Sequence, residues 1–259
     1  MRAKKSLGQH WLRSGSARQA IIEAAGLSDP TSPRLRGATT TVVEIGPGEG
    51  FLTETLLETG VKVVAVEKDD RLIEVLQAKF KKEILDGQLE LRHVDILDFD
   101  YNLLPKTYSL VANIPYYITG AVIKKFLTSE NQPQSMTLLV QKEVAERIAR
   151  EKKESLLSIS VKVYGQPKYI KTVPAGAFAP APKVDSAILS ITNISRQNFE
   201  NVSEEKFFAI LKRGFAHKRK LLKSNLSCSA EVLANCHINE QARAENLTLD
   251  QWLCLCKNC

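Results

Sequence analysis

The tetrapeptide Asn113-Ile114-Pro115-Tyr116 is the part of the chain whose residue types most directly suggest chemistry. It follows an apolar run, Tyr108–Ala112, that predicts a buried strand. The Asn113 side-chain carbonyl and the Ile114 backbone carbonyl can both accept hydrogen bonds from one exocyclic amino group, and the Tyr116 ring offers a flat face for the base that carries it. The motif therefore favours a nitrogen nucleophile as substrate. The simpler alternative is an X-Pro turn that only ends a strand, because a residue before proline is restricted to extended conformations.

A glycine-rich turn upstream makes a nucleotide site the stronger interpretation. The run Val42–Ile45 predicts a short strand, which leads into Gly46-Pro47-Gly48-Glu49-Gly50 and then into an amphipathic segment from Phe51 to Thr59. Glycines let the backbone approach a ligand that a Cβ atom would exclude, and the following helix begins with free N–H groups. Glu67 ends the next apolar run, Lys62–Val66, where its carboxylate can hold the ribose hydroxyls of an adenosine-type cofactor.

A nicotinamide dinucleotide would use a similar turn, so a nicotinamide oxidoreductase is an alternative. A Rossmann dehydrogenase has its third glycine where this chain has Phe51, and a bulky ring there disfavours a bound pyrophosphate. A further run, Leu89–Val94, ends in Asp95, which can accept from an adenine amino group. Glycine or polar residues then occupy four successive strand ends: Gly46, Glu67, Asp95 and Asn113. Ligands bind at this edge of open α/β sheets, so we expect an adenosine-type cofactor beside the amino substrate.

Strand-like and helix-like segments alternate along most of the chain, which predicts the α/β class. Further helices are expected over Arg71–Leu85, Ala121–Leu127, Lys142–Arg150 and Leu156–Val163, the last with a periodicity that also partly fits a strand. Further strands are expected over Met136–Val140, Tyr169–Ala175 and Val184–Ile191, the last two as a hairpin-like pair on the sheet. From Thr192 the apolar pattern becomes helical. We therefore predict a Rossmann-like domain over 1–191 and a small all-helical domain over 192–259.

Positive charge is concentrated at two places in this chain of 259 residues, whose formal net charge is +7. Residues 1–22 and 207–230 each hold several basic side chains and no acid. Such clusters favour a polyanion through counterion release, although a solvated helix face is the alternative. We expect five residues of the second cluster to bind RNA: Arg213, Lys218, Arg219, Lys220 and Lys223.

The length allows a full α/β core and one small extra domain. No apolar run approaches the roughly 18 residues that span a bilayer, and the basic N-terminus is followed by no apolar signal core. We expect a cytoplasmic, monomeric protein without a membrane partner.

The five cysteines, at 228, 236, 254, 256 and 259, fall near the end of the chain. They lack the paired C-x-x-C knuckles of zinc sites, and their segment resembles an amphipathic helix in which cysteines serve as small apolar residues. We expect no bound metal, and no disulfide in a reducing cytosol.

Eight motifs together resemble the ribosomal RNA adenine dimethyltransferases over nearly the whole chain. The motifs are Gly8-Gln-His-Trp-Leu12, Glu44-Ile-Gly-Pro-Gly48, Glu67, Asp95, Asn113-Ile-Pro-Tyr116, Gln141–Arg147 with Phe178–Ser186, and Arg213–Leu221. The resemblance looks closest to the bacterial KsgA group, which dimethylates two adjacent adenosines near the 3′ end of 16S rRNA. It implies a class I methyltransferase fold, S-adenosylmethionine as cofactor, rRNA of the small ribosomal subunit as partner, and a role in subunit biogenesis.

The resemblance also implies roles for individual residues. The expected cofactor-binding residues are His10, Leu12, Gly46, Gly48, Glu67, Asp95 and Asn113, with Glu67 on the ribose and Asp95 on the adenine. The expected residues around the target adenine are Asn113, Ile114, Tyr116 and Phe178, with both rings stacking on it. For Phe178, a ring that only covers the core is the alternative. Bacterial members commonly carry Asn-Phe where this chain has His10-Trp11.

Two further alternatives remain for the RNA function. The sister group of this family methylates large-subunit RNA and confers macrolide resistance, and it shares the Phe178–Ser186 segment. An assembly factor that acts mainly by binding the small subunit would also need the basic clusters.

Overall fold

The computed structural model describes residues 4, 7–28 and 40–258. They form two compact units, one comprising the residues up to Ala145 together with Lys168–Ile194, the other comprising Glu146–Pro167 together with the residues from Ser195 onward. The second unit therefore takes in an internal segment as well as the C-terminal residues. A functional division of the chain at residue 191 stays a prediction.

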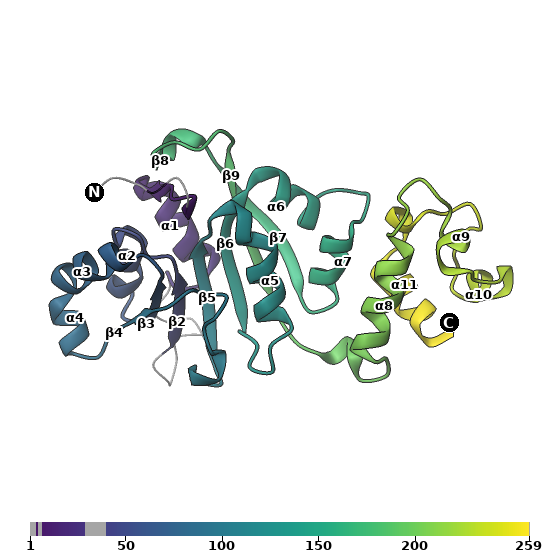
Figure 1. The fold of residues 1–259 in the computed structure, drawn as a ribbon, viewed down its shortest axis with the longest axis horizontal. Helices are drawn as coiled ribbons and strands as arrows, with labels where there is room; N and C mark the ends of the chain where they lie inside the picture. The colour runs from purple at the N-terminus through teal and green to yellow at the C-terminus, as the bar shows by residue number, and fades with distance from the viewer. Residues whose placement is uncertain (1–3, 5–6, 29–39, 259) are drawn as a thin grey trace. The chain divides into compact units, whose positions relative to one another are not determined.

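The first unit is built on a seven-stranded sheet with the order β4-β3-β2-β5-β6-β9-β7 (Figure 1). Five strands pair in parallel: β2 (Thr41–Ile45), β3 (Lys62–Glu67), β4 (Leu89–His93), β5 (Tyr108–Asn113) and β6 (Ser135–Gln141). β9 (Ser186–Thr192) pairs with β6 in the antiparallel sense, and β7 (Gln166–Val173) is its other neighbour. This architecture confirms the predicted α/β class, and the last two strands are adjacent as expected.

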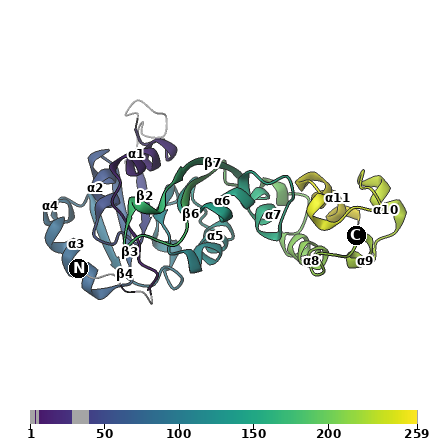
Figure 2. The ribbon, with the colours of Figure 1, turned by 90° about the horizontal axis from the view of Figure 1, so that it is seen from above.

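The helices of the first unit are α1 (Gly15–Ala24), α2 (Phe51–Glu58), α3 (Asp70–Lys79), α4 (Lys81–Leu85) and α5 (Thr119–Leu127), and α6 (Lys142–Ala149) leads the chain into the second unit. Figure 2 shows α1 and α5 on opposite faces of the strands. The long strands between them are almost fully buried, because helices cover both faces of a parallel sheet.

The prediction of one helix over Arg71–Leu85 was wrong, because the helix is interrupted at Phe80. This residue has φ −111° and ψ 32°, outside the helical region, and its side chain is buried. Its ring lies so close beneath Gly50 that an added Cβ atom there would come within 2.5 Å of it. We infer that packing of this ring under the glycine turn overrides the apolar helical periodicity.

The order of the strands places a topological switch between β2 and β5. From β2 the chain continues to β3 and β4 on one side, whereas from β5 it continues to β6 on the other. The register pairs Ile45 with Ala112, so Gly46 and Asn113 follow side by side at the carboxyl ends of these strands. A crevice outside the sheet forms at such a switch point.

A two-stranded ribbon ties the N-terminal segment to the rest of the first unit. β1 (Trp11–Leu12) pairs with β8 (Phe178–Ala179), and Leu12 is opposite Phe178. Both side chains belong to the hydrophobic core beneath α1 and α2.

The second unit is helical. It contains α7 (Leu156–Lys162), α8 (Glu204–Gly214), α9 (Leu222–Leu226), α10 (Ala230–Asn235) and α11 (Leu249–Asn258). The prediction of a helix over Leu156–Val163 was correct, and Ser155 and Ser158 form a capping box at its start. The core of the unit contains the fully buried Trp252, whose ring would meet any Cβ atom at Gly214 within 2.4 Å.

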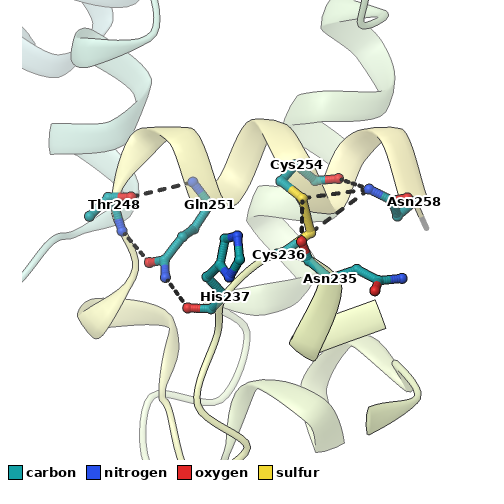
Figure 3. Close-up of a disulfide and its surroundings, with 7 residues drawn as sticks. All are labelled: Asn235, Cys236, His237, Thr248, Gln251, Cys254 and Asn258. Atoms are coloured by element: carbon teal, nitrogen blue, oxygen red, sulfur yellow. Dashed lines mark hydrogen bonds between the residues drawn. A yellow bond between two sulfur atoms is a disulfide. The ribbon is translucent and has the colours of Figure 1, made fainter. Parts of the chain in front are cut away.

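The prediction that no disulfide forms is contradicted, because Cys236 and Cys254 are bonded across a separation of 18 residues (Figure 3). Cys236 caps α10 and Cys254 lies on α11, so the packing of these helices brings the two sulfurs together. The expectation rested on the redox compartment alone and could not include this pairing. Among the residues described, no cluster of His, Cys, Asp and Glu could hold a metal ion. Nor does this part of the chain contain a helix long and apolar enough to cross a membrane.

Candidate active site

A cavity of about 350 Å³ lies at the carboxyl ends of β2 to β5. Its walls include Gly46, Glu67, Asp95 and Asn113, the four residues expected at successive strand ends. The N-terminal segment from Leu7 to Trp11 and the turn from Pro115 to Ile118 complete the lining. The structure therefore brings most of the predicted site residues to one place.

The glycine turn after β2 leaves one face of its backbone open to this cavity. Gly46 has φ +65°, and a Cβ atom added to it would find no heavy atom nearer than the Asn113 carbonyl oxygen at 4.0 Å. Gly48 has φ +61°, and its added Cβ atom would lie 2.8 Å from the Trp11 ring. Gly46 thus leaves room for a ligand, whereas Gly48 leaves room for a side chain of the N-terminal segment.

Glu67 is held rigidly at the end of β3. Its side chain accepts backbone N–H bonds from Gly48 at 3.2 Å, Lys68 at 2.9 Å and Asp69 at 2.8 Å. Burial raises the pKa of the Glu67 carboxyl, and these N–H bonds counteract the increase. A carboxylate fixed in this way can accept from two ribose hydroxyls without reorganising.

Asp95 follows β4 and is paired with a lysine that the sequence argument did not single out. Lys68 Nζ lies 2.5 Å from Asp95 Oδ2, and the Leu97 N–H donates to Oδ1 at 2.9 Å. Burial alone would raise the pKa of Asp95, but the bonds from Lys68 and Leu97 lower it. The carboxyl is therefore an ionised acceptor on the cavity wall.

The amide of Asn113 has a defined orientation. Its Nδ2 donates to the His10 backbone carbonyl at 2.8 Å. The His10 carbonyl oxygen can only accept a hydrogen bond, so the amide atom that faces it must be the nitrogen. The other terminal atom of the Asn113 amide is therefore Oδ1. Oδ1 and the Ile114 carbonyl have no hydrogen-bond donor among the described residues, which leaves two acceptors beside the cavity.

Tyr116 begins the short helical turn Tyr116–Ile118 and lies beside His10. Its hydroxyl is 2.7 Å from Ser186 Oγ, and burial raises its pKa. The His10 ring is stacked on it at a centroid distance of 6.0 Å, with His10 Nδ1 2.8 Å from the Pro180 carbonyl. Because that carbonyl only accepts, Nδ1 carries a hydrogen. Both rings are cavity-lining groups, as expected.

Two predicted site residues are not brought into the cavity lining. Leu12 is 4% exposed and Phe178 is 5% exposed, and both pack in the core of the first unit. Ring stacking by Phe178 and cofactor contact by Leu12 stay predictions.

The predicted RNA-binding residues lie in the second unit. α8 ends at Gly214, so Lys218, Arg219 and Lys220 are on an exposed turn before α9 and not on a helix. Lys223 is paired with Glu240 at 3.2 Å, and Arg213 donates to the Leu226 carbonyl at 3.0 Å. The turn therefore carries the exposed part of this basic cluster.

The N-terminal basic cluster has mostly internal partners where the structure describes it. Arg13 pairs with Glu49 at 2.6 Å and lies over the Phe51 ring, and Arg18 donates to the Phe51 carbonyl. Arg2 and Lys5 lie outside the described residues. Arg13 and Arg18 therefore bind residues of the glycine turn and the start of α2, whereas Lys4 pairs with Asp69.

Comparison with known proteins agrees with this geometry. The family model described as ribosomal RNA adenine dimethylase matches residues 1–259. A protein of Dehalococcoides mccartyi named ribosomal RNA small subunit methyltransferase A is 41% identical over 268 residues, covering 99% of this chain and 88% of that protein.

Solved structures extend the likeness to the fold. A dimethyladenosine transferase from Plasmodium falciparum superposes with a TM-score of 0.77 at 26% identity, covering 95% of this chain and 96% of the other. The 23S rRNA methyltransferase ErmE gives 0.74 at 23% identity, covering 95% and 98%, which bears on the fold alone. On its full-length family match and its similarity to curated relatives, this chain belongs to the ribosomal RNA adenine dimethylase family.

Proposed function

We propose that this protein transfers methyl groups from S-adenosylmethionine to N6 of two adjacent adenosines near the 3′ end of 16S rRNA, dimethylating each during small-subunit biogenesis. Its family and its 41% identical small-subunit relative support this choice of RNA and reaction. We place the activity in the cytoplasm, with the protein acting as a monomer.

The residues around the cavity fit an adenosine-type cofactor. Gly46 leaves an open face for its amino-acid part, Glu67 presents a fixed carboxylate to its ribose, and Asp95 presents an acceptor to its adenine. When bound, S-adenosylmethionine supplies an electrophilic methyl group on a sulfonium. The cavity wall from Leu7 to Trp11 would exclude water from the bound cofactor.

The observation that carries the proposal is the fixed amide of Asn113. With Nδ2 bonded to the His10 carbonyl, only Oδ1 can meet a substrate amino group, and the Ile114 carbonyl provides a second acceptor. Adenine N6 is a weak nucleophile because its lone pair is delocalised into the ring. Two acceptors for its N–H bonds would favour a pyramidal nitrogen with its lone pair free for attack.

Positioning would supply most of the rate enhancement. A near-attack arrangement can contribute roughly 7 to 11 kcal/mol in favourable systems. The amine loses one proton for each methyl group gained, and that proton can leave to solvent. Because Asn113 Oδ1 only accepts, it can still hold the one remaining N–H of a monomethylated amine, which permits the second transfer.

Each unit holds residues that would bind RNA. Tyr116 would stack on the extruded adenine, and Phe178 would do so once exposed by a local movement. The basic turn, with Lys218, Arg219 and Lys220, would contact phosphates without selecting sequence.

A competition experiment tests this function. Unmethylated small and large ribosomal subunits are incubated together with the protein and labelled S-adenosylmethionine, and label in each RNA is counted. We expect label in 16S rRNA. Label mainly in large-subunit RNA would assign the sister activity, and binding of small subunits without label would assign an assembly factor.

A further inference from the structure

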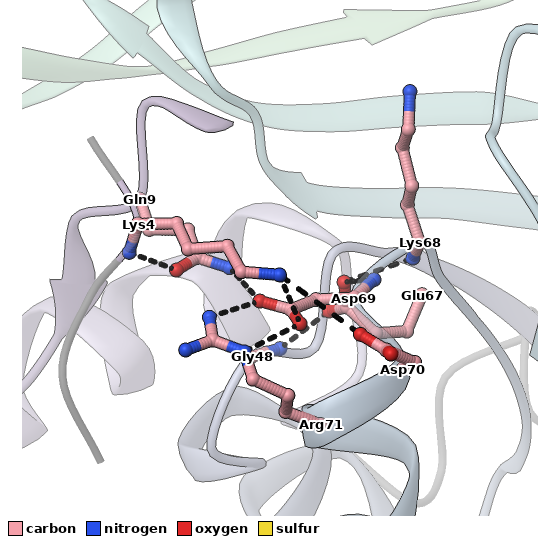
Figure 4. Close-up of polar contacts among 8 residues, drawn as sticks. All are labelled: Lys4, Gln9, Gly48, Glu67, Lys68, Asp69, Asp70 and Arg71. Atoms are coloured by element: carbon pink, nitrogen blue, oxygen red, sulfur yellow. Dashed lines mark hydrogen bonds and ion pairs between the residues drawn. The ribbon is translucent and has the colours of Figure 1, made fainter. Parts of the chain in front are cut away.

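Asp69 is a buried residue at the centre of a polar cluster beside the cavity (Figure 4). Its side chain is fully buried and accepts a two-pronged contact from Arg71, with Nε at 2.9 Å and an Nη at 2.6 Å. Arg71 belongs to the same turn at the start of α3, so this pair holds the carboxylate in place locally. These bonds hold the pKa of Asp69 well below its usual range, so the carboxylate is ionised.

Two further donors reach Asp69 from the N-terminal segment. Gln9 Nε2 donates to Oδ2 at 3.0 Å, and Lys4 Nζ lies 3.3 Å from Oδ1. The Gln9 side chain also accepts from the Lys4 backbone N–H at 2.7 Å, so the two donors are linked to each other. The segment is thus tied to Asp69 across about 60 positions of sequence.

Residues 7–11, the N-terminal strap, form one wall of the cavity. Leu7, Gly8, Gln9, His10 and Trp11 all line it. The strap is held at its other end by the bond from Asn113 to the His10 carbonyl and by β1. It therefore crosses the cavity from the end of β3 to the end of β5.

The backbone of Asp69 contacts the expected ribose-binding residue. Its N–H donates to Glu67 Oε1 at 2.8 Å, while its side chain holds the strap. One residue therefore links the carboxylate that would bind the cofactor to the wall that would cover it. Asp69 and Lys4 do not themselves line the cavity.

We propose that Asp69 is a positioning residue that latches the N-terminal strap over the cofactor cavity through Gln9 and Lys4, and so sets the rate at which the cofactor enters and leaves. The inference deepens the proposed function and rests on its cofactor. Opening the latch leaves Asp69 paired with Arg71, so release of the strap does not strand a buried charge. The strap can therefore open and close without unfolding the start of α3.

The test compares variants that do not remove a cavity-lining side chain. Lys4→Ala and Asp69→Asn each weaken the latch, and Asp70→Asn is the matched control because its exposed carboxylate is 3.9 Å from Lys4 and does not line the cavity. Hydrogen exchange of the strap amides is measured in the cofactor-free proteins. Binding and dissociation of S-adenosylhomocysteine are then measured by calorimetry and stopped flow.

We expect faster strap exchange in both latch variants, and cofactor-product dissociation faster by about three- to tenfold, the range of one hydrogen bond. KM for S-adenosylmethionine should rise while kcat changes little, and Asp69→Glu should restore part of the effect. Asp70→Asn should behave as the wild type.

Unchanged strap exchange and dissociation in folded Lys4→Ala would overturn the proposal, even if Asp69→Asn fails to fold. Failure of the wild type to bind S-adenosylhomocysteine would instead contradict the proposed function. The hydrogen-exchange measurement would still test whether Asp69 holds the strap in that case, because it is made without cofactor.

Discussion

The side-chain amide of Asn113 is bonded to the backbone carbonyl of His10, 103 positions earlier, at 2.8 Å. This contact fixes which end of the Asn113 amide is the carbonyl oxygen, and we propose that this oxygen accepts from the substrate amino group. Asn113→Ala should therefore lower the rate of methyl transfer by about 100-fold or more, as loss of one preorganised polar contact does in other enzymes. Single-turnover transfer to small subunits measures the rate, and circular dichroism checks folding. A folded Asn113→Ala protein with near-normal transfer would contradict the assigned role.

Tyr116 provides a ring and a hydroxyl whose contributions can be separated. Tyr116→Phe loses only the contact with Ser186 Oγ and should keep most of the transfer rate. Tyr116→Ala also loses the stacking face, worth roughly 1 to 3 kcal/mol per base in single-strand binders, so transfer should fall by about 5- to 150-fold. Equal rates for the two variants at limiting RNA would show that the ring does not contact the base.

Gly46 and Gly60 form a matched pair for testing the cofactor cradle. Both have positive φ, and neither has a neighbour that an added Cβ atom would strike closer than 4.0 Å. Replacement by Ala should cost both variants a similar free energy of unfolding, about 1 to 2 kcal/mol. Only Gly46 lines the cavity, so only Gly46→Ala should weaken S-adenosylhomocysteine binding in a titration. Equal affinities of the two variants would place the ligand elsewhere.

Glu44 predicts a pH dependence of stability. Burial raises its pKa to about 8 from 4.5, and the charge of Glu67 contributes to the increase. Between these values the folded state keeps a proton that the unfolded state releases, so Glu44 lowers the free energy of unfolding as pH rises. Glu44→Gln should match the wild type near pH 4.5 and become more stable by a few kcal/mol, in order of magnitude, near pH 8. Urea titrations at several pH values measure this difference, and a constant difference would contradict the assignment.

Local patterns in the sequence were enough to predict where these strands end and that the residues there share one cavity. Glu67, Asp95 and Asn113 each follow an apolar run, and parallel strands bring such ends to one edge. The same reasoning explains why the glycine turn and the Asn113 motif were found to share a cavity.

Contacts between distant segments could not be predicted in this way. The latch at Asp69 depends on Gln9 and Lys4, and the partner of Asp95 is Lys68, whose side-chain direction no periodicity reveals. The disulfide between Cys236 and Cys254 likewise depends on how α10 and α11 pack. The sequence predicts that Phe178 lies in a loop with its aromatic ring available. It does not predict that the ring is buried, because burial depends on the pairing of β8 with β1.

Mapping of the modified nucleotides tests the central claim most directly. Small subunits lacking the modification are incubated with S-adenosylmethionine and either wild-type protein or Asn113→Ala, and the 16S rRNA is digested and analysed by mass spectrometry. We predict N6,N6-dimethyladenosine at two adjacent positions near the 3′ end with the wild type, and only a trace with the variant after the same short incubation. Methyl groups on another atom or another nucleotide, or equal modification by both proteins, would contradict the account.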